Sequence, residues 1–300
     1  SVKDIYEMAL LLCGGTEKFD QAPTVVHYSE PISPLVYFDP AIEKVMFCAE
    51  KRIPLINFPA PQCCGSSPAT FAGALVQASA ESLSGLVVHQ LVGPGAPFIY
   101  GAFTTIMDMR STIFSYGAVE MSLMTAAMAQ MAQSYGLPFF GTAGATDAKA
   151  CDAQAGAEAA WQILSAAAAG SGLVHDCSSW MDHGSVASPE FMVLVHDIVD
   201  AVDHYMQGIA VTAETLALEV IDRVGPGGHY LQDPHTLKNF KKIKYSDIFE
   251  RMVYDQWKAA GSKTFEQRLQ AETLKKMSHR PSPLPVETTK TLDEMQKSWQ

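Results

Sequence analysis

The chain alternates short apolar runs, each ending in polar residues, with longer stretches of helical periodicity. In the clearest case Phe139-Phe140 leads into a polar, glycine-containing loop, an alanine-rich helix follows from Asp152, and Leu173-Val174 then leads into His175. Strands that alternate with helices of this length predict βαβ units and a parallel sheet. The pattern predicts six strands, at Val25-Val26, Leu55-Ile56, Leu86–Val88, Phe98-Ile99, Phe139-Phe140 and Leu173-Val174.

Helical periodicity predicts helices between most of these strands, over 67–83, 118–135, 153–169 and 189–206. The stretch between Leu91 and Phe98 is too short for a crossover helix. Either the strand from Phe98 is therefore accessory, or a loop has replaced one helix. On the predicted helix 118–135, the stripe formed by Met121, Met124, Met128 and Met131 indicates ordinary core packing.

The predicted fold class is α/β, a TIM (β/α)8-type barrel. Such a barrel needs eight strands and the pattern predicts only six, so we expect one or two βα units to be absent from the N-terminal side. We assign 1–242 to this barrel domain. Residues 243–300 are rich in charged side chains and contain Pro281–Pro285, so we expect a C-terminal helical extension there.

Composition narrows the functional classes. A net charge of −11 and a pI near 5.2 argue against nucleic acid or an anionic membrane as a partner. No apolar run approaches the length of a membrane span and no basic leader opens the chain, so we expect a cytoplasmic protein. Six cysteines without regular spacing indicate free thiols rather than a disulfide framework.

Several standard catalytic signatures are missing from the sequence, among them HExxH, GxSxG, the GxxxxGK[ST] phosphate loop and an HxH pair. The glycine-rich run Gly225–Gly228 does not follow a strand, and we interpret it as a turn. Polar residues at the strand ends remain the best candidates, because barrel enzymes place their chemistry there.

A series of long motifs resembles the trimethylamine methyltransferase family, from about Glu30 to Thr236. The motifs are Gly93-Pro94-Gly95 with Gly101, Asp108-Met109-Arg110, AGATDAKACDAQAGAE over 143–158, His175 with Gly184, and GPGGHYLQDPHT over 225–236. The resemblance implies a TIM barrel that moves a methyl group from a methylated amine to the cobalt of a corrinoid. That cofactor is expected on a separate corrinoid protein, with none bound tightly by this chain.

One departure from the family narrows the substrate. The trimethylamine branch carries pyrrolysine, and we place that position in the Gly144–Lys149 loop, where this chain has only standard residues. Reduced cobalt is itself the nucleophile, and a quaternary ammonium leaves as a neutral amine without an activating residue. We therefore expect a quaternary amine such as glycine betaine as the substrate, with trimethylamine as the other candidate.

A quaternary ammonium head binds best to aromatic faces. Aromatic residues lie at or just after predicted strand ends, and we favour Tyr100, Phe140 and Trp180 among the candidates Tyr28, Phe58, Tyr100, Phe103, Phe140 and Trp180. Arg110 could bind a substrate carboxylate or form a salt bridge with Asp108, and both interpretations stay open. The remaining substrate-binding candidates are His89, Gln90, His229 and His235.

The predicted catalytic residues are His175, at a strand exit, and Asp147, in the family motif over 143–158. Lys149 and Asp152 complete a charged group around that loop, and Asp152 also stands where the next helix needs an N-cap. Gln154 and Glu158 lie four residues apart on that helix and are expected to support the loop.

Two other functions compete with corrinoid methylation. Cys63-Cys64, with Cys151 or Cys177 as a third thiolate, could bind zinc in a thiol (homocysteine) methyltransferase. Alternatively the chain is a non-catalytic betaine- or corrinoid-binding protein. We expect no metal under the main hypothesis, and a homo-oligomer as the assembled state.

Overall fold

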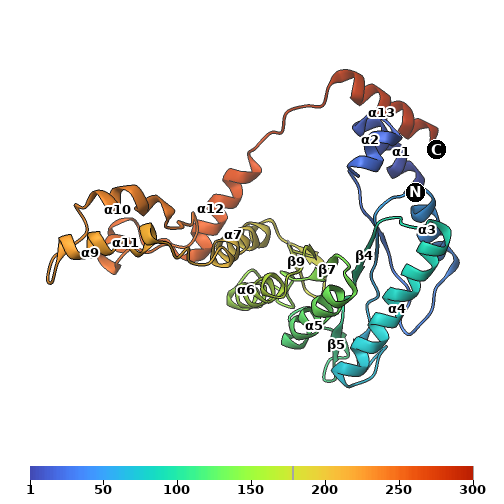
Figure 1. Cartoon of the computed structure of the whole chain (residues 1–300), viewed down its shortest axis with the longest axis horizontal. Helices are drawn as coiled ribbons and strands as arrows, with labels where there is room; N and C mark the ends of the chain where they lie inside the picture. Colours follow the sequence, from blue (N-terminus) through green and yellow to red (C-terminus); the bar gives the residue numbers. More distant parts are fainter. Residues whose placement is uncertain (178, 300) are drawn as a thin grey trace.

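A curled sheet of five parallel strands forms the centre of the molecule (Figure 1). The structure, a computed structural model, describes residues 1–177 and 179–299. The strand order is β1-β2-β4-β7-β8, so each new strand of this sheet is added beside the previous one. These strands are β1 (His27–Ser29), β2 (Leu55–Asn57), β4 (Phe98–Gly101), β7 (Phe139–Thr142) and β8 (Leu173–His175).

A helix follows each of the five strands and packs on the outer face of the sheet (Figure 1). The result is a mixed α/β architecture in which five βα units form a curled half-barrel. The helices are α3 (Asp39–Glu50), α4 (Phe71–Val92), α5 (Val119–Tyr135), α6 (Ala153–Ala168) and α7 (Pro189–Met206).

Side chains alternate between the two faces of the sheet, as the two-residue period of a strand requires. Leu55, Phe98 and Tyr100 face the helices, in one core cluster with Met128 of α5. Ile56, Ile99 and other apolar residues form a separate cluster on the concave face. At Gly101 a Cβ would lie 2.4 Å from the carbonyl oxygen of Phe140, so glycine lets neighbouring strands and rings approach closely there.

The loops that follow the strands form two small sheets at the carboxyl end. The loops after β2 and β4 pair in the order β3-β5-β6, and the residues after β8 form an antiparallel pair. These strands are β3 (Gln62–Cys63), β5 (Thr105–Asp108), β6 (Ile113–Phe114), β9 (Trp180–Met181) and β10 (Val186–Ala187).

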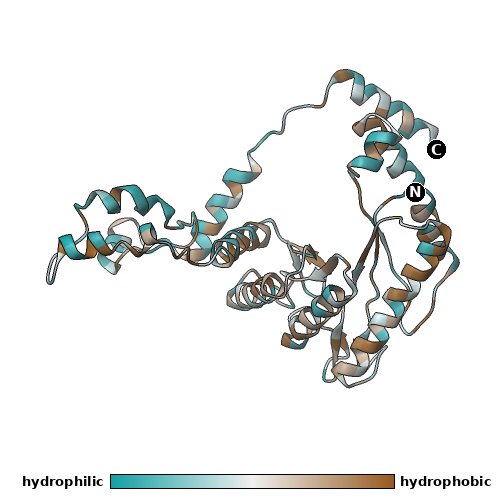
Figure 2. Ribbon diagram, viewed as in Figure 1, coloured by the Kyte–Doolittle hydropathy of each residue, from teal (hydrophilic) through white to brown (hydrophobic). Residues whose placement is uncertain are grey.

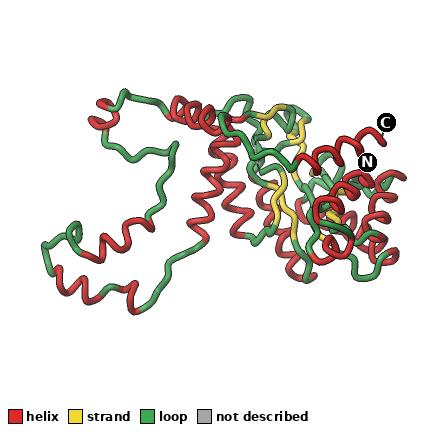
Figure 3. Tube along the Cα trace, turned by 90° about the horizontal axis from the view of Figure 1, so that it is seen from above, coloured by secondary structure: helices red, strands yellow, loops and turns green. Residues whose placement is uncertain are grey.

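Helices α1 (Val2–Cys13) and α2 (Thr16–Gln21) precede the sheet. After α7 the chain extends as a helical arm with no buried residue in any of its four α-helices, and both chain ends lie near one another (Figures 1 and 3). The arm contains α8 (Ala213–Leu216), α9 (Leu218–Val224), α10 (Pro234–Asn239), the 3-10 helix η1 (Phe240–Lys242) and α11 (Tyr254–Ala259).

The arm returns to the body through α12 (Phe265–Met277), which packs on α7 and buries Leu269, and the chain ends in α13 (Val286–Ser298). The helices of the arm are mainly hydrophilic (Figure 2), but several apolar residues in it, including Ile209 and Leu231, are exposed. The domain boundary at 242 and the homo-oligomeric state stay predictions.

The strand expected at Leu86–Val88 was wrong, because these residues form the last turns of α4. A short apolar run cannot distinguish a strand from a half-buried helix by period alone. The strand beginning at Phe98 is central, between β2 and β7, and α4 itself is the crossover helix before it. Both explanations offered for a missing helix were therefore wrong.

Helix α4 also corrects the statement that no run is long enough for a membrane span. By length and composition it passes that test, alone among the helices of the described residues. Its polar side chains face the protein, however. Glu81 is buried and accepts hydrogen bonds from Ser33 and the Leu35 backbone, and Ser82 donates to the Asn57 carbonyl. These contacts identify α4 as a helix that covers the sheet. A core helix can be as long and as apolar as a membrane span.

The expected methionine core is confirmed, since Met121, Met124 and Met128 are buried.

His89 is buried too, with its ring 5.7 Å from that of Phe98 and its Nε2 without a hydrogen-bond partner. Burial lowers the pKa of His89 to about 4. Gln90 holds the turn before β4, donating to the Ala96 carbonyl and accepting from the Gly95 amide. Both residues lie at the amino end of the sheet, which corrects their assignment to a strand exit.

The pKa of His89 in the folded state lies below its unfolded value near 6.5. Burial of the neutral imidazole therefore contributes fully to the free energy of unfolding above pH 6.5, and this contribution is lost as the pH falls toward 4. His27 has a lowered pKa for the same reason and adds to the fall. We expect His89→Leu to reduce the loss of unfolding free energy between pH 7 and pH 5 by about 2 kcal/mol. Urea titrations at pH 7 and pH 5 measure the free energy of unfolding of each variant. Exposed His204→Leu is the control, and an equal reduction there would contradict the interpretation.

Candidate active site at the carboxyl end of the sheet

Four rings, each in or just after a different strand, meet on the concave face at the carboxyl end of the sheet. We call Tyr28, Phe58, Phe140 and His175 the ring cluster. Tyr28 of β1 stacks on His175 of β8, with centroids 5.7 Å apart and planes inclined by 12°. Phe58 follows β2 and lies 4.9 Å from Phe140 and 5.4 Å from His175. Tyr28, Phe140 and His175 are half-buried, so the cluster reaches the surface.

The loop after β4 adds three more rings beside this cluster. Phe103 stacks on Phe58 at 6.4 Å and contacts Phe114 and Tyr116 at 4.8 and 4.9 Å. Burial, with the charges of Asp176, Glu30 and Asp147, raises the pKa of Tyr116 to about 12. The phenol is therefore neutral at physiological pH and retains the electron-rich ring face that attracts cations.

Two carboxylates touch the ring cluster. The Tyr28 hydroxyl donates to Glu30 at 3.2 Å, and an Asp176 oxygen lies 2.9 Å from His175 Nδ1, although the angle between them does not make a hydrogen bond. Burial raises the pKa of Tyr28 strongly, and Glu30 adds to that shift. Tyr28 and the phenylalanine rings thus present neutral aromatic faces beside negative charge, the combination that favours an organic cation.

A cavity of about 470 Å³ opens beside Tyr28, at the carboxyl ends of β1 and β2. We call it the Tyr28 cavity. Its charged lining residues are Glu30 and Lys44, and its aromatic ones are Tyr28 and Phe38. Lys44 of α3 donates to the Tyr28 carbonyl at 3.4 Å. The volume falls within the range of about 300–1,000 Å³ that small-molecule sites occupy.

Asp147 lies in the loop after β7 and organises the other side of the cluster. Its carboxylate accepts from the Ser115 hydroxyl and from the Tyr116 amide at 2.7 Å, and it lies 3.0 Å from His183 Nδ1. Lys149 Nζ lies 3.2 Å from His183 Nε2. Asp147 and His183 line a separate cavity of about 280 Å³. Asp147 therefore fixes the loop that carries Tyr116.

Glu158 of α6 holds the same loop through hydrogen bonds. One of its oxygens accepts from the Thr146 hydroxyl and the Asp147 amide, and the other from Gln154. Asp152 forms the expected N-cap of α6, accepting from the amides of the second and third helical residues. A Cβ at Gly117 would lie 2.4 Å from the Glu158 carboxyl group, so the loop at Gly117 packs closely against this side chain of α6.

Other predicted substrate residues lie away from the ring cluster. Tyr100 is fully buried on the outer face, where its hydroxyl contacts Ser79, because it occupies the opposite phase of β4. Arg110 is exposed at the β5–β6 turn, and its backbone amide, rather than its guanidinium, bonds Asp108. Trp180 is half-exposed in β9 and makes no ring contact within the described residues.

His229 and His235 lie in the helical arm, remote from the sheet in both views (Figures 1 and 3). The preceding Asp233 caps α10 and binds Arg223 at 2.7 Å, so the 225–236 motif organises the arm itself. The structure therefore does not bring these two residues to the ring cluster, and their role in substrate binding stays a prediction.

The proposed zinc ligands do not converge. Cys63 is buried against Met124, while Cys64 is exposed with a left-handed backbone. Cys151 lies at the start of α6 and Cys177 packs beside Gly144. Within residues 1–177 and 179–299, no three histidine, cysteine or acidic side chains are grouped to hold a metal ion. The geometry gives the zinc alternative no site.

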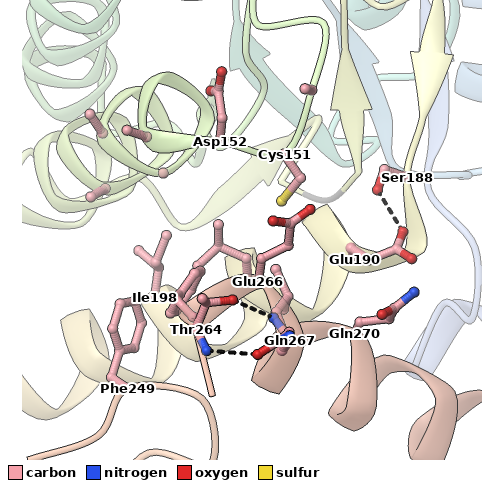
Figure 4. Close-up of a pocket in the computed structure, with 18 residues that line it drawn as sticks. Cys151, Asp152, Ser188, Glu190, Ile198, Phe249, Thr264, Glu266, Gln267 and Gln270 are labelled. Carbon is pink, nitrogen blue, oxygen red and sulfur yellow. Dashed lines mark hydrogen bonds between the residues drawn. The ribbon is translucent and has the colours of Figure 1, made fainter. Parts of the chain in front are cut away.

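The largest cavity, about 1130 Å³, lies between α6, α7 and α12 (Figure 4). Cys151 and Glu266 face it from opposite sides, and Phe249 and Ile198 line its apolar part. It lies outside the sheet, and no ring-cluster residue lines it. We therefore place the candidate site at the ring cluster and not in the largest cavity.

Comparison with known proteins identifies the family. The family model for trimethylamine methyltransferase matches residues 1–297. The chain belongs to the trimethylamine methyltransferase family. It is 33% identical to a glycine betaine methyltransferase of Desulfitobacterium hafniense strain Y51 over 85% of this chain and 53% of the relative. It is 32% identical to a trimethylamine methyltransferase of the same species, strain DSM 10664 / DCB-2, over 97% and 58%.

A trimethylamine methyltransferase of Methanosarcina thermophila is 36% identical over 78% of this chain and 48% of the relative. The chain thus spans about half the length of these curated relatives. The matches include both proteins named for a quaternary amine and proteins named for a tertiary one. Family membership therefore does not determine which methylated amine is the substrate.

Four polar residues that matter at the site were absent from our sequence candidates: Glu30, Lys44, Asp176 and His183. Glu30 and Asp176 each follow a strand directly, so the strand-exit rule that selected His175 could have found them. Lys44 lies inside a helix and His183 in a long loop, and neither position carries a signal in the sequence pattern.

The support given by Glu158 generates a stability prediction. We expect Glu158→Ala to lower the free energy of unfolding by about 1–3 kcal/mol, because the Thr146 hydroxyl and the Asp147 amide lose their buried acceptor. Gln154→Ala removes only an exposed partner of the same carboxylate and is expected to cost less than about 1 kcal/mol. Chemical denaturation of both variants measures the difference. Equal effects would show that the loop does not depend on Glu158.

Proposed function

We propose that this chain carries the amine-binding site of a methyltransferase, which moves a methyl group from a methylated amine to the cobalt of a corrinoid. The corrinoid is held by a separate protein, and the substrate is a quaternary amine such as glycine betaine. The five βα units form part of a TIM (β/α)8 barrel. The observation that carries the proposal is the ring cluster at the carboxyl ends of the strands, in a member of this family.

The rings suit a permanently charged methylated nitrogen. Such a head group cannot donate a hydrogen bond, so it gains most from the ring faces of Tyr28 and its neighbours and from nearby carboxylates. Glu30 and Asp176 supply that negative charge beside the rings. Apolar contacts around the head group also exclude water from the methyl carbons.

The reaction needs little chemistry from the protein. A corrinoid docked here would supply reduced cobalt as the nucleophile and accept the methyl group, and the amine would leave with the electron pair of the broken C–N bond. A quaternary substrate leaves as a neutral amine, so no proton has to be added. The task of this chain is to hold one methyl carbon toward the open side of the ring cluster, where Phe140 and His175 are half-buried.

The two predicted catalytic residues receive different roles. His175 lies within the cluster, stacked on Tyr28, and we assign it contact with the substrate. Asp147 contacts the Tyr116 amide and His183 rather than the four rings, and we assign it the positioning of the Tyr116 loop. Lys149 bonds the Asp147 carbonyl and belongs to the same support.

The test is methylation of Co(I) cobalamin by glycine betaine, followed by its absorbance spectrum. We expect activity with glycine betaine and little with trimethylamine. Tyr28→Leu should lower kcat/KM at least about tenfold, because the ring face is lost, a contact of about 1–2 kcal/mol. Tyr28→Phe keeps the face and should retain most of the activity.

Two results would contradict the proposal. Methylation by trimethylamine but not by betaine would reverse the substrate assignment. Tight betaine binding without any cobalt methylation would favour the non-catalytic binding protein.

A further inference from the structure

The helices that cover the three inner strands of the sheet expose large apolar side chains. Helix α5 packs between α4 and α6, and hydrophobic residues recur along α4 (Figure 2). We call the outer surface of these three helices the neutral face. It is defined by the exposed residues Val76, Val87 and Leu91 of α4, Leu123 of α5, and Trp161 and Leu164 of α6.

None of the charged residues in these helices lies on the neutral face. Charged residues make up 18% of the chain, yet α4, α5 and α6 contain only Glu81, Glu120 and Glu158. Glu81 and Glu158 are buried, and both accept hydrogen bonds from backbone amides. Glu120 is half-buried at the cavity that Asp147 lines. A helix that covers a core normally turns its charged side to water, and here the charges point inward instead.

Charged side chains return at both borders of the neutral face. Helix α3 packs beside α4 and exposes Glu43 and Glu50, and α7 packs beside α6 and exposes Asp203. Single apolar residues are scattered over the surface of most proteins, but an extended apolar patch with a polar rim is typical of a protein-binding surface. We therefore interpret the neutral face as a contact surface.

The charge of the chain favours a second copy as the partner. Each copy has a net charge of −11, so two copies repel one another wherever their charged surfaces meet. A two-fold contact places the same patch on both subunits, and the patch must therefore be compatible with itself. The neutral face meets this requirement, because it brings no exposed charge against a like charge.

The size of the neutral face agrees with that of a dimer interface. Its helices have 22, 17 and 16 residues, which corresponds to lengths of about 24–33 Å. With neighbouring axes about 10 Å apart, the three helices together form a face of roughly 700 Å². A stable protein interface buries about 800 Å² on each partner. The neutral face is thus close to the area that two copies need.

Further strands of a barrel would leave the neutral face uncovered. The outermost strands of the parallel sheet are β1 and β8, and an added strand would pair at one of these edges. Helices α4, α5 and α6 belong to the inner strands β2, β4 and β7. An added βα unit would therefore lie beside α3 or α7, where the exposed surface is charged.

We propose that the neutral face binds a second copy of this chain, so that the protein forms a two-fold dimer through α4, α5 and α6. The ring cluster lies on the concave side of the sheet, opposite these helices, and dimerisation leaves it open. The inference is independent of the proposed function, because association through the neutral face involves neither the amine nor the corrinoid.

The test is sedimentation velocity of the full chain across micromolar concentrations. We expect the unmodified protein to sediment as a dimer. Leu91→Glu and Leu123→Glu each place a charge of the protein's own sign on the neutral face. Each should raise the Kd of the dimer at least about tenfold, because the new carboxylate would be buried without a partner. The double variant should be a monomer.

Three further variants complete the design. Ile209→Glu makes a matched exchange at a residue of the arm that is 92% exposed, and it should leave the dimer unchanged. Leu91→Met keeps an apolar side chain on the neutral face and should also keep the dimer. Circular dichroism shows whether each variant is folded. If Leu91→Glu unfolds the chain, Val76→Glu replaces it, since Val76 is 69% exposed on the same helix.

Dissociation by the two glutamate variants of the neutral face, with the dimer intact in Ile209→Glu and Leu91→Met, supports the proposal. An unmodified protein that is monomeric at every concentration would overturn it. A dimer that persists in both glutamate variants would also overturn it, because the contact would then lie elsewhere. The same holds if a monomeric chain co-sediments with phosphatidylcholine vesicles and the glutamate variants abolish this, since the face would then bind a lipid surface.

Discussion

The stack of Tyr28 on His175 joins the first and last strands of the five-strand sheet. Strands at opposite edges of a flat sheet of this size cannot touch. The twist of parallel strands must therefore curl this sheet until the two edges face each other across its concave side. Phe58 and Phe140 fill the space between them. The candidate site is the product of that curl, since no single loop contains it.

This constraint also explains which parts could be predicted from sequence. Polar residues follow most strands of the sheet, and three of the five βα units, β4–α5, β7–α6 and β8–α7, were predicted at nearly the observed positions. Helix α3 was not predicted. His175 and Phe140 were correctly placed at strand ends because apolar runs mark where strands stop. Helix α4 failed, because its final turns carry an apolar run as short and as dense as a strand.

The face on which each ring lies could not be read from the sequence. Tyr100 and Phe140 occupy equivalent stretches of neighbouring strands, yet Tyr100 packs against the helices while Phe140 joins the ring cluster. A shift of one residue exchanges the two faces, and continuous apolar strands give no alternation from which to choose. Contributions from helices and long loops, such as Lys44 and His183, depend on tertiary packing that no local pattern encodes.

Electrostatics give the site its character. The tyrosine rings stay neutral, carboxylates lie beside them, and a single lysine faces the adjoining cavity. Together with membership of the family, these features support the proposal that the ring cluster binds a methylated ammonium group.

The claim that the positive charge of the ligand is recognised can be measured directly. Glycine betaine and 3,3-dimethylbutanoate share shape and carboxylate, and differ only in a charged nitrogen against a neutral carbon. Calorimetric titration of this protein should give at least about tenfold tighter binding of glycine betaine, as cation–π attraction of about 1–2 kcal/mol requires. Equal affinity for the two ligands would contradict the account.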